Sequence, residues 1–324
     1  MPLPKYLSWT GCGSSCGEPP GVFTGGTMHL FGIAASRVAA QALADQFLNP
    51  VAKAEFGNRL RYTSFVDAAL ITFLDIDKCT TSAEAIGWFP GRECALWIPL
   101  FETKLPKIGQ VALPKIRVVM WSPYIFINYA IGMVTGREVW GWSKALGNIG
   151  FPAAGAATPK FTLSTVLFDT FNPLNPGRDG TLLELTGTTA LSTASTWTSF
   201  NAAAKEIIGR LTGVPATSVP APFSSSTPKF PSIALKQFRD SQAPDRACYQ
   251  ALVNSPVRLK TFGGGGLHGG NFSLKLTTCD SHPIVTKFLG KTATAGSTTL
   301  PLDWGAWVKF DFDALAGTEI ARSV

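Results

Sequence analysis

The sequence predicts an α+β fold built mainly from antiparallel strands. Short runs with β-type alternation dominate the chain, segments with helical spacing are few, and strands do not alternate regularly with helices. Hydrophobic residues make up 45% of the 324 residues and charged residues only 15%, which indicates a substantial buried core and excludes a disordered chain. The length allows two average domains or one elaborated β-rich domain, no internal repeat is visible, and we expect one main domain.

The elements of the first half follow in order. Residues 1–27 are rich in Gly, Pro and Cys and are expected to form an N-terminal arm, on the surface or in a subunit contact. Residues 36–48 have helical spacing, with Ser36 placed as the N-cap. Strand-like segments then occupy residues 59–77, 93–101, 117–134, 161–169 and 181–187.

Residues 195–213 form the clearest predicted helix of the chain. Its apolar residues recur at intervals of three and four, and Gly213 is placed to end it. A loop rich in Pro and Ser is expected at 214–230. Strand-like segments resume at 231–240, 246–262, 270–279 and 305–312.

Charge and cysteine usage exclude several classes of partner. The net charge of +7 comes from 28 scattered basic residues, so we expect no nucleic-acid partner. The six cysteines include no CxxC pair, which favours free thiols in a reducing compartment and no metal site. The N-terminus lacks a signal peptide's apolar stretch, and the most apolar window, 118–134, is shorter than the roughly 20 residues that span a bilayer. We therefore expect a cytoplasmic protein that does not enter a membrane.

The glycine-rich segment GGGGLHGGN covers residues 263–271. It matches neither a dinucleotide-binding nor a Walker motif, and its glycines permit positive φ and close backbone approach. His268 in this segment either faces a pocket or is a solvated loop residue.

The segment GRECALWIPL, residues 91–100, places Glu93 just before a strand that alternates into the core. A carboxylate at the mouth of an apolar cavity can serve as a general acid or base. The alternative is a surface glutamate paired with Arg92 or Arg137.

The segment GREVWGWSKALG, residues 136–147, sets charged residues among aromatic and small apolar ones. Arg137 and Glu138 are candidates for a buried ion pair. Lys144 lies next to Trp140 and Trp142 in the sequence, and burial disfavours a charged ammonium, which frees the amine to attack a carbonyl. The alternative is a lysine whose stem covers a tryptophan while its charge reaches water.

These segments together resemble the acetoacetate decarboxylase superfamily. TGREVWGWSKALGNIGFP resembles the family signature G-R-E-x-x-(G/A)-(F/Y)-P-K-K-L-(A/G), and ECALWIP resembles a family strand with a glutamate before Ile-Pro. FPSIALKQFRDSQAPDRACYQALVNSPV, residues 230–257, resembles a later loop and strand. The resemblance extends from about residue 22 to 312, and residues around 190–225 look like an insertion into a domain covering 28–324.

The resemblance implies a β-barrel or cone around an apolar cavity, with a few peripheral helices, assembled into homo-oligomers and using no cofactor. In decarboxylating members it implies that the second lysine of the P-K-K forms a Schiff base with a β-keto acid, and that the imine accepts electrons as CO₂ leaves. Aligned without a gap, Ser143 occupies the proline position, Lys144 that of the first lysine and Ala145 that of the second. Alanine cannot form an imine.

Two further family residues have no counterpart in this chain. A pocket arginine maps near Gly26, and a glutamate of the next core strand maps near Leu74, with Asp75 on the opposite face. Glu93, Arg137 and Glu138 match the family pattern. The chain thus combines the family framework with a partly different set of polar residues.

Three functions remain open from the sequence. Lys144 acts as the nucleophile of an imine-forming lyase, Glu93 performs acid–base cyclisation or dehydration with Arg137 or Lys144 stabilising negative charge, or the cavity only binds an apolar molecule. The nine tryptophans and 22 phenylalanines favour a carbonyl substrate larger than a four-carbon acid, of an aromatic or polyketide-like kind found in secondary metabolism. We predict a lyase-type enzyme with Glu93, Lys144, Arg137 and Glu138 as catalytic residues. The predicted substrate contacts are Trp97, Trp140, Trp142, Ala145 and His268.

Overall fold

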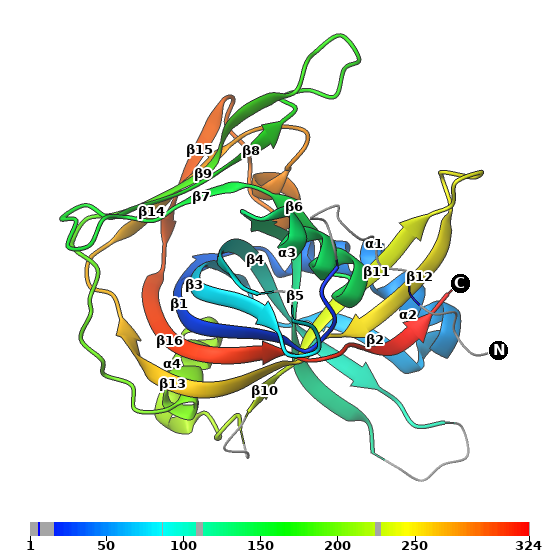
Figure 1. Cartoon of the computed structure of the whole chain (residues 1–324), viewed down its shortest axis with the longest axis horizontal. Helices are drawn as coiled ribbons and strands as arrows, with labels where there is room; N and C mark the ends of the chain where they lie inside the picture. Colours follow the sequence, from blue (N-terminus) through cyan, green and yellow to red (C-terminus); the bar gives the residue numbers. More distant parts are fainter. Residues whose placement is uncertain (1–5, 7–15, 86, 108–112, 224–227, 324) are drawn as a thin grey trace.

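The computed structural model describes residues 6, 16–85, 87–107, 113–223 and 228–323, and it contains two β-sheets (Figure 1). The strands of the large sheet are β1 (Gly21–Ala34), β2 (Leu60–Ser64), β3 (Ala68–Thr81), β4 (Phe89–Lys104), β5 (Lys115–Ile127), β6 (Lys144–Leu146), β10 (Lys229–Phe230), β11 (Ser232–Arg239), β12 (Ala247–Asn254), β13 (Val257–Leu267), β16 (Trp304–Ala314) and β17 (Thr318–Arg322). The small sheet contains β7 (Asn148–Gly150), β8 (Lys160–Leu167), β9 (Arg178–Gly187), β14 (Phe272–Thr277) and β15 (Ser297–Leu302).

The helices are few and short. The α-helices are α1 (Arg37–Phe47), α2 (Asn49–Phe56), α3 (Ala130–Thr135) and α4 (Phe200–Thr212), and single turns of other helix types occur at Gly57–Arg59, Gly136–Trp140, Ala216–Ser218 and Ile284–Phe288. No helix among the described residues combines the length and the apolar character required to cross a membrane. The predicted class of mainly antiparallel strands with few helices is confirmed.

The large sheet does not close on itself. Its main path runs β10-β13-β16-β1-β3-β4-β5-β11-β12-β17, and among the described strands the two at its ends pair with only one neighbour each. Its strand pairs are antiparallel except where β5 meets β6 and β11. A barrel or cone was expected, and no closed barrel is seen among the described strands, where the terminal strand β10 pairs with β13 alone.

Several predicted elements lie where the sequence placed them. Ser36 caps α1 by accepting a hydrogen bond from the N–H of Ala39, 3.3 Å away. Gly213 ends α4 in the left-handed conformation, with φ of 72°. The helix begins after Ser199, later than the predicted start at 195.

Other segments differ from the prediction. Residues 21–27, expected in the N-terminal arm, form the first half of β1. The predicted strand 117–134 is divided between β5 and α3. Residues 1–5 and 7–15 of the predicted arm lie outside the described residues.

The two faces of the large sheet carry separate apolar clusters. The larger core cluster includes Phe31, Phe73 and Leu96 on one face, packed with leucines of the small sheet such as Leu183 and Leu274. The smaller core cluster includes residues of β3 and β16 whose side chains point the other way, such as Leu74, Ile76 and Phe310. The second face is the one that carries the candidate site.

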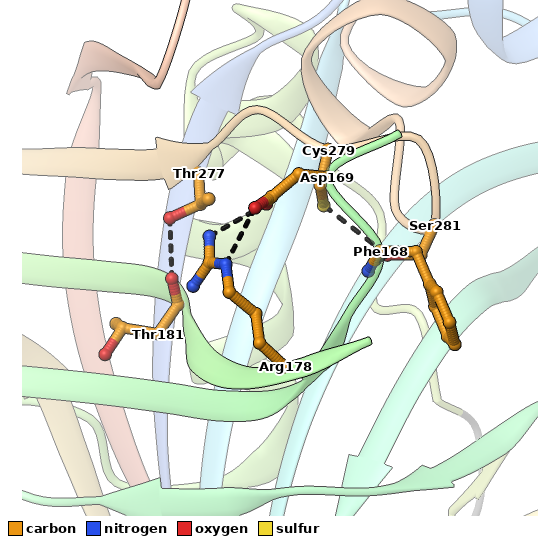
Figure 2. A network of polar contacts seen from close by, with 7 residues as sticks. All are labelled: Phe168, Asp169, Arg178, Thr181, Thr277, Cys279 and Ser281. Carbon is orange, nitrogen blue, oxygen red and sulfur yellow. Dashed lines mark hydrogen bonds and ion pairs between the residues drawn. The ribbon is translucent and has the colours of Figure 1, made fainter. Parts of the chain in front are cut away.

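Polar contacts connect the start of β9 with the segment after β8 and with the end of β14 (Figure 2). Arg178 at the start of β9 donates two hydrogen bonds to Asp169, at 2.7 and 2.8 Å. The hydroxyl of Thr277 on β14 donates to the carbonyl of Thr181 on β9, at 2.6 Å. These contacts are mainly exposed, and they hold the sheet that covers the larger core cluster.

Candidate functional site

A pocket of about 730 Å³ lies on the face of the large sheet that carries the smaller core cluster. Leu74 of β3, Glu93 of β4 and Ile127 of β5 are register partners, so their side chains project together into it. The lining is mainly apolar, as expected for a site that takes an apolar molecule. Among the described residues, its charged members are Glu18, Glu93, Arg117, Lys144 and Lys229.

Lys144 and Glu93 form an ion pair within this pocket. Lys144 Nζ lies 2.7 Å from Glu93 Oε2, and the two side chains are only 8% and 18% exposed. An ion pair that is largely withdrawn from water interacts much more strongly than a surface pair. The structure therefore joins two residues that the sequence identified from separate segments.

Strand pairing determines which residue of the lysine segment faces the pocket. β6 runs parallel to β5, with Lys144 beside Ile125 and Ala145 beside Phe126. Ile125 lines the pocket, whereas Phe126 belongs to the larger core cluster on the other face. Lys144 accordingly faces the pocket, and Ala145 packs against that core.

The turn before β6 restricts the position of the Lys144 side chain. Gly136 opens a π-helical turn, and a Cβ atom at this position would lie 2.5 Å from Lys144 Cδ. Gly141 ends the turn with φ of 74°, close to the backbone of Lys236. The hydroxyl of Ser143 donates to the carbonyls of Ser122 and Pro123, at 3.1 and 3.0 Å. These contacts fix the backbone on both sides of the turn.

The three predicted tryptophans line the same pocket. The ring centre of Trp142 lies 4.9 Å from Lys144 Nζ, within range of a cation–π contact. Trp142 stacks on Trp140, with ring centres 4.8 Å apart, and Trp140 Nε1 donates to the carbonyl of Leu315. Trp97 donates from its ring nitrogen to the hydroxyl of Thr72, at 3.0 Å. Each ring is therefore held in place by a second contact.

Arg137 and Glu138 do not form the expected buried pair. Arg137 is exposed and donates to the carbonyl of Lys144, 3.3 Å away. Glu138 is half-buried and accepts a hydrogen bond from the hydroxyl of Tyr6. Neither residue is among those that line the pocket, although Trp140 of the same helical turn is. Arg137 contributes to the site only through the backbone of Lys144.

His268 lies on the opposite face of the large sheet, away from Lys144. Its Nε2 lies 3.1 Å from Nδ1 of His29, and its Nδ1 accepts from the N–H of Ser192. The rings of Phe31 and Phe272 surround it. His268 therefore does not line the pocket, and the predicted contact with substrate does not match its position.

The positions of the two family residues that this sequence lacks are apolar. Gly26 lies in β1, where a Cβ atom would come 2.8 Å from the carbonyl oxygen of Phe310. Leu74 lines the pocket, and Asp75 points to the other face, where it pairs with Arg92 at 3.2 Å. The end of the pocket near Leu74 therefore provides no arginine from β1.

Cys79 also lines the pocket, which was not predicted. Burial raises the pKa of its thiol to about 12, while Lys144 has a smaller lowering effect and Glu93 a still smaller raising effect. A thiol that stays protonated at neutral pH is a poor nucleophile. The alternation of Leu70, Thr72 and Leu74 along β3 would put Cys79 on the opposite face, and a register shift between Ile76 and Cys79 brings it to the pocket.

Comparison with known proteins identifies the fold. No family model matches the sequence, and no curated protein matches it. Among solved structures, acetoacetate decarboxylase from Legionella pneumophila superposes with a TM-score of 0.59 at 13% identity, covering 99% of this chain and 93% of that one. MppR, an enzyme of enduracididine biosynthesis, gives 0.55 at 15% identity, over 94% and 88% of the two chains.

An acetoacetate decarboxylase-like enzyme from Sphingomonas wittichii RW1 gives a TM-score of 0.56 at 10% identity, covering 97% of this chain and 98% of that one. Identities this low establish the architecture and not the reaction. The resemblance deduced from the GRE segment is thus confirmed at the level of the fold: the chain has the acetoacetate decarboxylase-like fold over nearly its whole length.

Proposed function

We propose that the chain is a lyase-type enzyme in which the amine of Lys144 attacks the carbonyl carbon of a largely apolar substrate. One observation carries the proposal: Lys144 Nζ lies 2.7 Å from Glu93 Oε2 in a mainly apolar pocket. This geometry places an amine, a proton acceptor and an apolar binding surface together. The enzyme is further expected to be a homo-oligomer that needs no cofactor.

Imine formation requires proton transfers that Glu93 is placed to perform. Glu93 takes a proton from the Lys144 ammonium, and the neutral amine forms a bond to the carbonyl carbon as the C=O electrons move onto oxygen. The protonated carboxyl then protonates that oxygen. A second proton passes from nitrogen through Glu93 to the hydroxyl, which leaves as water and gives a protonated imine.

With a β-keto acid, this imine accepts electrons from the bond that breaks. The bond to the carboxylate carbon is cleaved, CO₂ leaves, and the bonding electrons move onto the imine nitrogen as an enamine forms. The enamine carbon takes a proton, and water hydrolyses the resulting imine to release the ketone and restore Lys144. An apolar surround favours loss of the carboxylate charge, because CO₂ is neutral.

Acid–base chemistry without an imine is the second candidate. In that reaction Glu93 moves a substrate proton, and the Lys144 ammonium stabilises the negative charge that develops on oxygen. Its support is that the Glu93 carboxylate and the Lys144 ammonium lie 2.7 Å apart in the pocket, so one can move a proton while the other stabilises negative charge. Arg137 no longer competes with Lys144 for this role, since its guanidinium is exposed.

Borohydride trapping tests the proposal directly. The protein is incubated with β-keto acids and larger aromatic ketones, reduced, and examined by intact mass and peptide mapping. We expect a reduced adduct on Lys144 that is absent in Lys144→Ala, and we expect Glu93→Gln to slow its formation by at least about 100-fold.

The alternatives give different results in the same experiment. Turnover without an adduct, lost in Glu93→Gln, supports acid–base chemistry. Ligand binding with neither adduct nor turnover indicates a non-catalytic binding protein that uses the same cavity.

A further inference from the structure

Helix α4 supplies an apolar wall to the pocket. Its lining residues recur at intervals of three and four: Phe200, Ala203, Ala204, Ile207, Ile208 and Leu211. This spacing places them on one stripe of the helix. The opposite side carries an ion pair between Arg210 and Glu206, 2.8 Å apart, as on a solvated face.

The stripe is only partly covered by protein. Ala203 is buried against the smaller core cluster, and Phe200 and Ile207 pack on its edge. Ile208 and Leu211 are half-buried and face the pocket. Half-buried apolar side chains that line a pocket can gain further burial from an apolar ligand.

The segment that leads into α4 is fixed by the glycine run of β13. The N–H groups of Thr196 and Trp197 both donate to the carbonyl of Gly265, at 2.9 and 3.0 Å. A Cβ atom at Gly265 would lie 2.8 Å from the Trp197 ring, and one at Gly266 would lie 2.9 Å from the carbonyl of Ala194. Glycine therefore allows this segment to lie directly on the strand.

A second contact fixes the chain that follows α4. The side-chain amide of Asn201 donates to the carbonyl of Phe223 and accepts from its N–H, both at 3.0 Å. Phe223 also lines the pocket. Because the helix is attached on both sides, α4 is a fixed wall of defined shape.

The pocket is far larger than the smallest substrate of this chemistry requires. A four-carbon β-keto acid has seven non-hydrogen atoms and occupies at most about 200 Å³, if each takes no more than the roughly 30 Å³ of a liquid water molecule. The pocket measures about 730 Å³. Most of its volume is therefore available to an apolar substituent.

We infer that α4 is the specificity element of the site and that it selects β-keto acids or ketones carrying an extended apolar substituent, which lies against Ala204 and Ile208. The inference rests on the proposed function for the reacting carbonyl. The apolar part of the substrate, however, is assigned from α4 alone. In this arrangement Lys144 and Glu93 act on the carbonyl while the substituent fills the remaining volume.

A chain-length series tests the inference. We measure kcat/KM for β-keto acids from acetoacetate to long-chain members in the wild type and in Ala204→Leu, with Lys205→Leu as the matched control on the same helix. We expect the wild type to prefer long chains, and Ala204→Leu to lower kcat/KM for them by about tenfold or more while affecting acetoacetate little. Lys205→Leu should keep the wild-type profile. Ile208→Ala should allow the enzyme to accept substrates with longer chains. This variant replaces Ala204→Leu as the test if Ala204→Leu does not fold.

A binding measurement separates this inference from the proposed function. Long-chain methyl ketones are titrated into Lys144→Ala and into Lys144→Ala/Ala204→Leu, with tryptophan fluorescence as the readout. Weaker binding in the double variant supports the α4 assignment even if no adduct forms on Lys144. The α4 assignment is overturned if the wild type shows no chain-length preference, or if Ala204→Leu lowers kcat/KM equally for all chain lengths. Neither result contradicts the proposed reaction at Lys144.

Discussion

The proposed function gives the Lys144–Glu93 pair a role that stability alone does not supply. Withdrawing two charges from water costs several kcal/mol per ion in real proteins, and the attraction between them often only offsets that cost. An apolar pair of similar volume would fill the same space on this mainly apolar face. The retained pair gives the pocket a proton donor and acceptor 2.7 Å apart, at the only lysine of the 136–147 segment.

Gly136→Ala tests how closely this lysine is positioned. Alanine suits the helical φ of about −60° at this position, so we expect the backbone to keep its conformation. The added Cβ, however, would lie 2.5 Å from Lys144 Cδ and would displace the flexible side chain from Glu93. A displacement of roughly 1 Å at a reacting group can reduce the rate about 100-fold.

The check is a comparison of adduct formation with thermal melting in Gly136→Ala. We expect slow borohydride trapping in a variant that still unfolds cooperatively on heating. If Gly136→Ala traps carbonyl substrates at the wild-type rate, close packing of Gly136 against the Lys144 side chain is not required for adduct formation.

At the residue scale, the sequence predicted those site residues whose environment is formed by residues close to them in the chain. Lys144, Trp140 and Trp142 were found because aromatic and small residues flank them, and Glu93 because it begins an alternating strand. The orientation of Arg137 could not be predicted in this way, since it lies in a π-helical turn, Gly136–Trp140, in which Trp140 faces the pocket and Arg137 is exposed. His268 also requires the fold, because its partner His29 is 239 positions away in the chain.

At the scale of elements, the glycine run of β13 shows how a backbone feature can support a binding surface. Residues 194–197 cross this strand at a distance that any side chain would prevent, and α4 follows directly. The close backbone approach expected for the run is confirmed. The segment that packs on this glycine run could not be predicted from the sequence, since Ser195 lies 70 residues before Gly265 in the chain.

Gly265→Ala should disturb α4 without touching the Lys144 end of the pocket. The new Cβ would lie 2.8 Å from both the Trp197 ring and the carbonyl of Trp307. We expect the free energy of unfolding to fall by about 1–3 kcal/mol, the usual cost of overpacking, because neither neighbour can move freely. Urea denaturation measures this loss.

Gly269→Ala is the matched control, because a Cβ at that position would meet nothing within 4 Å. It should unfold as the wild type does. Equal stability of Gly265→Ala and Gly269→Ala would show that the segment before α4 is not held by the glycine run.

Local chemistry located the start of α1 and the end of α4, although α4 begins at Phe200 and not at the predicted residue 195. Ser36 and Gly213 mark ends through local chemistry, a side-chain cap and a left-handed glycine. Strand β1 was not expected to begin at Gly21, because glycine-rich sequence resembles a loop, yet pairing with β3 and β16 on both sides makes it a strand. Pairing between distant segments is tertiary information, which local patterns do not contain.

At the scale of the whole molecule, the large sheet separates two kinds of polar pair. One face holds the charged Lys144–Glu93 pair in the pocket, and the other holds His29 and His268 beneath the small sheet. Because the Ser192 N–H donates to His268 Nδ1, His268 carries its proton on Nε2 and donates to Nδ1 of His29. This arrangement requires both rings to be neutral.

The histidine pair should make the fold sensitive to mild acid. Burial lowers the pKa of His268 to about 4, and burial together with the neighbouring His268 lowers that of His29 to about 3. Both values lie below the 6.5 of an unfolded histidine, so the unfolded chain binds more protons and stability falls as the pH drops below about 6.5. Between pH 6.5 and 5, protonation of the two histidines in the unfolded chain lowers the free energy of unfolding by at most about 3 kcal/mol. Most carboxylates remain ionised over this pH range.

Urea denaturation at pH 6.5 and at pH 5 tests this expectation. The free energy of unfolding should differ less between the two pH values in His29→Gln/His268→Gln than in the wild type, because glutamine can donate and accept hydrogen bonds but does not titrate. An unchanged difference in the double variant would mean that other groups cause the acid sensitivity.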